Sequence, residues 1–142
     1  MLFRSDDNAI SYDSNGSTCA IIYKTISDQY GKFSLIKVLS GKVTPDTNLT
    51  NTRTGTVEKI GHIYYMQGKK TIEVKEISCG DIGAIAKLSD SKTGDTLSDP
   101  KKLVTAKGIV FAEPCYSMAI APKTRGQEDK IASGITKLAE ED

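Results

Sequence analysis

The stretch CAIIYKTI occupies residues 19–26 and is followed by the polar segment SDQYGK at 27–32 and by FSLIKVL at 33–39. The two outer segments are rich in β-branched and aromatic residues and are too short for a typical helix, which favours β-strands. Gly31 in the polar segment can adopt the positive φ of a tight hairpin loop. The stretch therefore predicts a β-hairpin.

Many short extended segments follow this hairpin, with turn residues between them. Further strands are predicted at residues 48–51, 56–60, 63–66, 71–74, 84–88 and 108–111, with a short extended piece within 92–97. No helical periodicity separates them, which is typical of a sandwich or a closed barrel. A closed barrel is favoured, because closure removes exposed sheet edges and these strands carry few of the prolines that protect an open edge.

The two ends of the chain differ from this body. Residues 1–17 lack periodicity and contain a polar, turn-rich run, so they predict a linker. Residues 18–112 form the predicted barrel. Residues 113–142 are expected to begin a second domain that is incomplete here.

This second segment has its own pattern. We expect a strand at 115–121, a loop at 122–127 and a helix from 128 to 142. In the helix Ile131, Ile135 and Leu138 recur at i, i+4 and i+7. One strand and one helix cannot bury their own apolar faces, so this helix is expected to dock on the barrel or to pair with another copy as a dimer.

The bulk composition is that of an ordinary soluble globular protein, with 38% hydrophobic and 26% charged residues. A formal net charge of +1 gives no global attraction to nucleic acid or membrane, so such binding would need a local patch. No apolar run approaches the roughly 20 residues that span a bilayer. The N-terminal segment has no apolar core of signal-peptide length. We expect a cytoplasmic protein without a membrane partner.

The three cysteines, Cys19, Cys79 and Cys115, are far apart and show no C-x-x-C spacing. A disulfide framework or a zinc site is therefore not expected. We expect all three thiols to be structural, and Cys19 and Cys115 lie in apolar strand-like runs where a thiol acts as a small buried hydrophobe.

Motifs of catalysis are missing from the sequence. It contains no G-x-x-x-x-G-K-[ST] phosphate loop, no G-x-G-x-x-G and no H-E-x-x-H. His62 is the single histidine and would be the base of a small cysteine-dependent enzyme that uses Cys79 or Cys115. No third group that would orient this base is evident, so no catalytic residue and no metal ligand are assigned.

Basic residues gather in one stretch of hairpins. Lys69 and Lys70 follow Gly68 at a loop tip, where both ammonium groups can reach backbone phosphates. Tyr64 and Tyr65 are close in sequence and offer a stacking surface, although alternation turns one of them inward. The alternative is a solvated lysine-rich turn. The predicted RNA-contact residues are Arg53, Lys59, Lys69 and Lys70, with Lys75 in the same stretch.

Several segments resemble bacterial translation elongation factor G, and they keep its order along the chain. The segments IYYMQGKK (63–70), ISCGDIGAIAKL (77–88) and TGDTL (93–97) are similar to its domain II. The segments FAEP (111–114), AIAPKTRGQEDK (119–130) and LAEED (138–142) are similar to the entry into its domain III. The likeness covers about residues 18–142.

The resemblance implies a translational-GTPase-type β-barrel followed by the start of a ferredoxin-like α+β domain. It implies a non-catalytic scaffold that packs against a missing GTPase domain and the rest of domain III, and that rests on small-subunit ribosomal RNA. GTP and Mg²⁺ would belong to that missing domain of the parent translocation factor, and this fragment would bind no cofactor. The expected interdomain bend is formed by Gly80, Asp81, Ile82 and Gly83, although an aspartate beside glycine commonly just caps a turn.

Two departures from the family pattern leave alternatives. The loop at residues 28–32 is one residue shorter than usual, and the segment before Thr18 does not resemble the usual linker. A divergent elongation-factor-G-like paralogue and a tetracycline-type ribosomal protection protein both stay open. The segment QEDK at 127–130 favours the former.

Overall fold

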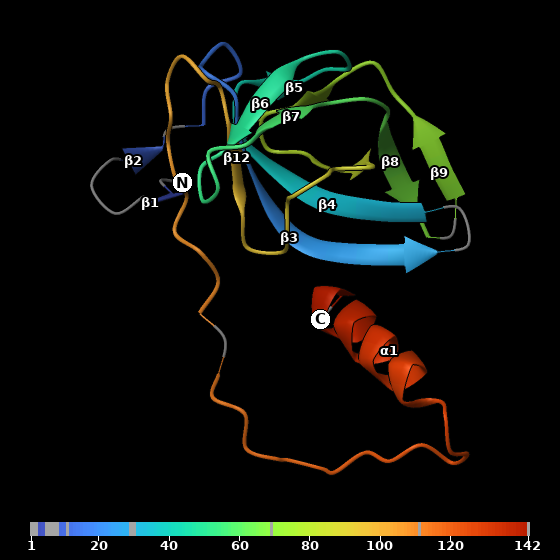
Figure 1. Cartoon of the computed structure of the whole chain (residues 1–142). Coiled ribbons are helices and arrows are strands. Elements are labelled where there is room, and N and C mark those ends of the chain that lie inside the picture. The colour runs from blue at the N-terminus through green and yellow to red at the C-terminus, as the bar shows by residue number, and fades with distance from the viewer. Residues whose placement is uncertain are drawn as a thin grey trace.

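The computed structural model describes residues 3–4, 9–10, 12–28, 31–68, 70–110 and 112–141. Its regular elements are strands followed by one C-terminal helix, so the predicted mainly β fold class is confirmed (Figure 1). In chain order they are β1 (Phe3–Arg4), β2 (Ala9–Ile10), β3 (Cys19–Asp28), β4 (Gly31–Ser40), β5 (Lys42–Val43), β6 (Asn48–Asn51), β7 (Val57–Lys59), β8 (Ile63–Gln67), β9 (Lys70–Glu73), β10 (Ile77–Ser78), β11 (Ile82–Ala86), β12 (Thr96–Ser98) and α1 (Glu128–Glu141).

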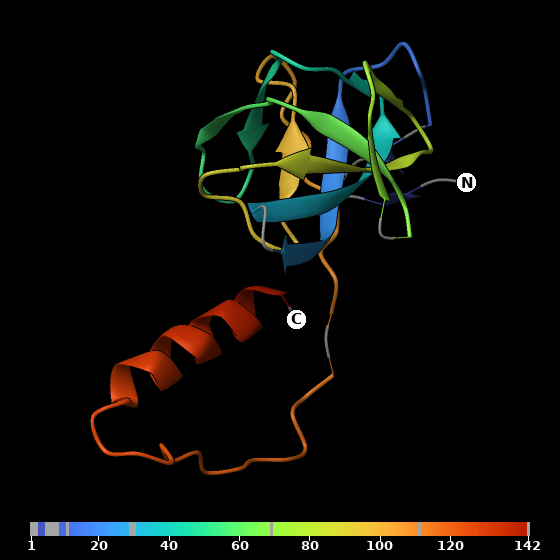
Figure 2. The same ribbon diagram turned by 90° about the vertical axis from the view of Figure 1, so that its right-hand side faces the viewer.

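An eight-stranded antiparallel sheet forms the body, in the order β7-β6-β12-β3-β4-β11-β8-β9. The short strands β5 and β10 form a separate antiparallel pair. The sheet curls around one interior, as Figures 1 and 2 show from two directions. The six inner strands of the ladder, from β6 to β8, all contribute to a single core, which is the arrangement of a small barrel. The core members are Ala20, Ile22, Ile36, Val38, Val43, Leu49, Ile60, Ile63, Ile77, Ile85, Leu88 and Leu97.

The predicted hairpin is the centre of this sheet. Strands β3 and β4 pair in antiparallel register, with Ala20 opposite Val38 and Ile22 opposite Ile36, and these four side chains point into the core. Burying each of the large aliphatic side chains among them stabilises the fold by about 1.5–3 kcal/mol. The alternation of apolar residues seen in the sequence therefore corresponds to the inward face of the two strands.

A smaller apolar cluster lies on the other side of β3 and includes part of the expected linker. Ile10 packs with Cys19, Ile21, Leu39 and Ala106, and all five are buried. The two-residue strands β1 and β2 pair antiparallel beside it. The linker prediction for residues 1–17 therefore missed a local contact, because the contact is made through the side chain of Ile10, and one apolar residue shows no periodicity in the sequence.

Two predicted strands are wrong. Within the described part of the chain, residues 108–110 and 112–121 contain no strand, and Phe111 lies outside that part. A strand is stable only beside a partner that satisfies its backbone groups, and neither segment has a neighbouring strand in this part. The alternating pattern is present in the sequence, but the pairing that it needs is not present in the structure.

The predicted C-terminal helix is confirmed as α1. Glu128 and Asp129 occupy its first turn, where the helix dipole favours acidic side chains. The helix lies beside β3 (Figure 1), yet Ile135 and Leu138 remain 47% and 67% exposed. Its apolar face is therefore mostly uncovered. The ferredoxin-like identity of this second segment stays a prediction.

Candidate functional site

The predicted RNA-contact residues lie on two separate hairpins. Arg53 is in the turn between β6 and β7, Lys59 ends β7, and Lys70 begins β9. Lys69 lies outside the described residues. The turn at residues 52–55 and the tip of the β8–β9 hairpin are on different sides of the barrel in both views (Figures 1 and 2). The structure therefore does not bring Arg53 and Lys70 into one patch.

The β8–β9 hairpin is the more accessible of the two. Gly68 adopts a φ of 60° at its turn, and all four side chains of β9 are exposed, including that of Lys70. On the other hairpin, Lys59 Nζ lies 3.5 Å from a carboxylate oxygen of Asp46, and both side chains are largely exposed. An exposed pair of this kind contributes little to stability, so the ammonium group of Lys59 is free to exchange partners.

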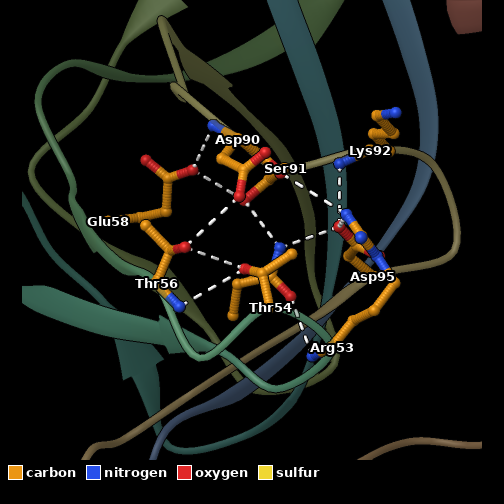
Figure 3. Close-up of polar contacts among 9 residues, drawn as sticks. Arg53, Thr54, Thr56, Glu58, Asp90, Ser91, Lys92 and Asp95 are labelled. Atoms are coloured by element: carbon orange, nitrogen blue, oxygen red, sulfur yellow. Dashed lines mark hydrogen bonds and ion pairs between the residues drawn. The ribbon is translucent and has the colours of Figure 1, made fainter.

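Arg53 is held more firmly (Figure 3). Its Nε donates to Asp95 Oδ1 at 2.6 Å and its Nη2 donates to Asp95 Oδ2 at 2.9 Å, which is a bidentate pair. Asp95 is only 5% exposed. Burial raises the pKa of Asp95, but the hydrogen bonds from Arg53, the Lys92 backbone and Asn51 outweigh burial and the pKa lies below its usual value. Arg53 therefore has a structural partner that the sequence did not reveal.

Asp95 belongs to a buried polar network that the sequence analysis missed. Its Oδ2 also accepts hydrogen bonds from the Lys92 backbone N–H at 2.9 Å and from Asn51 Nδ2 at 2.8 Å. Asn51 Nδ2 lies 3.2 Å from Ser91 Oγ and connects Asp95 to the neighbouring part of the network. These groups fix the turn at 92–95 against the end of β6.

Glu58 on β7 forms the other half of the network (Figure 3). It is 2% exposed and accepts four hydrogen bonds, from Ser89 N at 3.0 Å, Ser89 Oγ at 2.7 Å, Asp90 N at 2.8 Å and Ser91 Oγ at 2.9 Å. Burial raises the pKa of Glu58, yet these hydrogen bonds lower it more, so the carboxylate is ionised at neutral pH. The network clamps the loop at 89–95 to the β6–β7 hairpin.

The predicted interdomain bend is tied to the neighbouring strand β4. Gly80 has a φ of 94°, which explains the glycine there. Its N–H donates to Val38 O at 2.9 Å, and Val38 N donates to Asp81 O at 3.0 Å. Lys37 Nζ donates to the Gly80 carbonyl. The bend is therefore a fixed part of the barrel wall.

The side chains of the bend point in different directions. The Tyr65 hydroxyl donates to Asp81 Oδ2 at 2.9 Å, and this bond to a carboxylate raises the pKa of Tyr65. Gly83 is buried, and a Cβ at this position would overlap the side chain of Ile77. Ile82 is 53% exposed. The bend thus presents one apolar side chain on the barrel surface.

The geometry of the thiols and of His62 does not favour a cysteine-dependent enzyme. Cys19 is buried, and burial raises its pKa to about 11. Cys79 donates to Leu39 O at 3.2 Å, and burial raises its pKa as well. His62 Nδ1 lies 2.5 Å from a carboxylate oxygen of Glu73, and in the described residues no hydrogen bond joins it to a thiol. Thiols with raised pKa values are poor nucleophiles at neutral pH.

Cys115 differs from the expected buried thiol, because it is exposed. It lies in the segment with a strand-like sequence and has no strand partner in the described part of the chain. Across the described residues, no group of three or more His, Cys, Asp and Glu side chains is arranged to hold a metal ion. Those residues also contain no helix of the length and apolar character that would cross a membrane.

Known proteins are similar in sequence to both the barrel and the segment that follows it. Residues 31–98 match the family described as elongation factor Tu domain 2. An elongation factor G of Cytophaga hutchinsonii is 38% identical over 125 residues, which cover 87% of this chain and 18% of that protein. An elongation factor G of Ureaplasma parvum serovar 3 is 38% identical over 138 residues, which cover 95% of this chain and 20% of that protein. The chain resembles elongation factor G proteins over most of its own length.

A solved structure supports the fold of this chain. A crystal structure of a protein from Thermus thermophilus superposes with a TM-score of 0.77, covering 89% of this chain and 19% of that chain. Its sequence identity of 24% makes this a likeness of fold alone. The chain spans about a fifth of the length of the elongation factor G relatives that it matches. It is therefore a translation elongation factor domain, and the predicted family resemblance is confirmed.

Proposed function

We propose that this chain is the non-catalytic, ribosome-contacting and interdomain scaffold module of a GTP-dependent translocation factor. Its relatives are elongation factor G proteins, which favours translocation over ribosomal protection. Its sequence contains no phosphate loop. GTP hydrolysis and the Mg²⁺ that serves it would therefore belong to a nucleotide-binding domain outside this segment. A factor that acts on ribosomes in this way would be cytoplasmic.

The exposed β8–β9 hairpin is the observation that carries the ribosome assignment. Every side chain of β9 is exposed, and Lys70 begins this strand directly after the turn. Lysine side chains at a protruding turn neutralise RNA phosphates through charge and reach, without base-specific geometry. Arg53 is held by Asp95 in a bidentate pair and would contribute less to RNA binding. Lys59 would exchange its exposed partner Asp46 for an RNA phosphate.

The scaffold role rests on the bend at residues 80–83. Backbone hydrogen bonds fix this bend to β4, and Ile82 presents an exposed apolar side chain. An apolar residue on a rigid surface is suited to packing against a neighbouring domain, because binding it requires no reordering of the backbone. We place the contact with the GTPase domain here.

Binding of the whole chain to purified small ribosomal subunits tests the ribosome assignment. The double variant Lys69→Ala/Lys70→Ala should bind about tenfold more weakly at moderate salt, since it removes charge that neutralises phosphate. The variant Lys101→Ala/Lys102→Ala is the matched control, because it removes an adjacent pair of lysines from another exposed turn. If the affinity falls equally in both variants, the loss of binding is explained by the lower net charge and not by a contact at this hairpin. An affinity that is unchanged in the first variant would remove the assignment.

A further inference from the structure

The polar segment at residues 13–18 lies against the barrel as a strap, although its sequence predicts a linker. At the start of the strap, the Asp13 carbonyl accepts a hydrogen bond from the Gly41 N–H at 2.7 Å. At its end, Thr18 Oγ1 donates to the Lys42 carbonyl at 2.8 Å. Both ends of the strap are therefore bonded to the junction between β4 and β5.

Gly41 is the seat of this strap. It has a φ of 65°, a backbone conformation that favours glycine. A Cβ added at this position would lie 2.6 Å from the Gly16 carbonyl oxygen and 2.9 Å from the Thr18 backbone nitrogen. Both distances are shorter than van der Waals contact, so a side chain at position 41 and the strap cannot occupy the same space.

The thiol of Cys79 connects the strap to β4. Its Sγ donates to the Leu39 carbonyl at 3.2 Å. Burial raises the pKa of this thiol, and a backbone hydrogen bond from Asp13 offsets part of that rise. Asp13 is thus bound on both sides, through its N–H by the sulfur of Cys79 and through its carbonyl by Gly41.

We propose that the strap is a latch over Cys79, closed when Asp13 is bonded to the sulfur and open when the strap leaves the barrel. Opening breaks the hydrogen bonds of the strap and leaves the core folded, as local opening in native proteins commonly does. The open form exposes the thiol to small electrophiles. A group attached to the sulfur then occupies the position of Asp13 and holds the strap open. The latch does not depend on ribosome binding or on a domain contact at Ile82.

Labelling of the whole chain with iodoacetamide, followed by mass spectrometry of its peptides, tests the latch. The thiolate sulfur displaces iodide and the thiol proton passes to the buffer, so each modified cysteine is counted separately. Gly41→Ala should accelerate the labelling of Cys79 by at least about tenfold, because its methyl group overlaps the strap. Gly55→Ala is the matched control, since Gly55 has a φ of 74° and an added Cβ would have no neighbour within 4 Å. Buried Cys19 is the internal reference for unfolding of the barrel.

A milder variant removes one bond of the strap and adds no atom to its seat. Thr18→Val deletes the hydrogen bond to Lys42 and should accelerate the labelling of Cys79 by about two- to tenfold, with that of Cys19 unchanged. If Cys79 reacts at the wild-type rate in both Thr18→Val and Gly41→Ala, the latch is refuted. Labelling of Cys19 that rises in step with that of Cys79 would also overturn it, because the barrel itself would then be opening.

Amide hydrogen exchange measured by NMR tests the reverse direction of the coupling. In a Cys115→Ser chain, carboxamidomethylation of Cys79 should accelerate exchange of the Gly41 N–H by about tenfold, because this N–H loses Asp13 as its acceptor. The Gly55 N–H, which donates to Asn51 O at 2.8 Å in another hairpin, should exchange as before. Unchanged exchange at Gly41 after complete modification of Cys79 would contradict the proposal.

Discussion

The buried carboxylate of Glu58 allows a sharp test of the polar network. Its two oxygens each accept one backbone N–H and one serine hydroxyl, from Ser89, Asp90 and Ser91. In the variant Glu58→Gln, one oxygen becomes an NH₂ group. A serine hydroxyl can rotate to accept from it, but a backbone N–H cannot, so one buried donor loses its acceptor whichever way the amide is turned.

The size of the effect follows from these contacts. Hydrogen bonds to a charged group contribute about 1.5–3 kcal/mol each and neutral ones about 0.5–1.5 kcal/mol, and a buried donor without an acceptor costs about 1–3 kcal/mol. The neutral glutamine avoids the desolvation cost of a buried charge, and this gain offsets part of the loss. We expect Glu58→Gln to lower the free energy of unfolding by roughly 2–4 kcal/mol, a large part of the stability of a small domain.

Urea unfolding followed by tyrosine fluorescence measures this change, since the sequence has six tyrosines and no tryptophan. Glu73→Gln is the matched control, because Glu73 is 60% exposed and its loss should alter stability by less than about 0.5 kcal/mol. A Glu58→Gln variant as stable as the control would refute the role of the charge.

The ionisation of Glu58 also determines how the stability difference between wild type and Glu58→Gln depends on pH. Hydrogen bonding lowers the pKa of Glu58 in the folded chain below its usual value of 4.5, so in acid the unfolded chain binds more protons. The contribution of the ionised Glu58 to the free energy of unfolding is complete above pH 4.5, and it is lost as the pH falls through the pKa of Glu58 in the folded chain. The stability gap between wild type and Glu58→Gln should therefore narrow from pH 7 towards pH 3. A gap that stays constant would contradict the assignment.

Three further predictions concern other parts of the chain. Gly83→Ala should lower the free energy of unfolding by about 1–3 kcal/mol, because the new Cβ would overlap the buried Ile77; an unchanged urea midpoint would contradict this overlap. Exposed Cys115 should react with iodoacetamide in the native chain and buried Cys19 only after unfolding; equal labelling by mass spectrometry would refute this difference. Arg53→Ala should lower the midpoint in the same urea assay, since the buried carboxylate of Asp95 loses two hydrogen bonds, and Arg53→Lys should recover only part of that loss.

The fold was predictable where the residue pattern of a segment is enough and where any partner strand lies next to it in the sequence. The hairpin of β3 and β4 needs only alternating apolar residues and a nearby turn, and both are visible in the sequence. Helix α1 is likewise visible from its spacing of apolar residues. The segments at 108–111 and 115–121 have strand-like composition too, but a strand also needs a partner, and sequence periodicity does not show whether one is present.

The polar network could not be predicted, because its members are far apart in sequence. Glu58 binds residues 31 to 33 positions away, and Arg53 binds Asp95 at a separation of 42 positions. Alternation along β7 would place the apolar Val57 inward, yet Val57 is 56% exposed and Glu58 is buried. Only the pairing of β6 with β7 and the position of the 89–95 loop reveal why a carboxylate is stable there.

The most direct test of the ribosome assignment is the salt dependence of binding to small ribosomal subunits. Each phosphate contact that a lysine makes contributes about 0.7–0.9 to the slope of log affinity against log salt concentration. We predict that Lys69→Ala/Lys70→Ala flattens this slope by roughly one to two, whereas Lys101→Ala/Lys102→Ala leaves it as in wild type. An identical slope in wild type and in Lys69→Ala/Lys70→Ala would contradict the claim that the β8–β9 hairpin contacts ribosomal RNA.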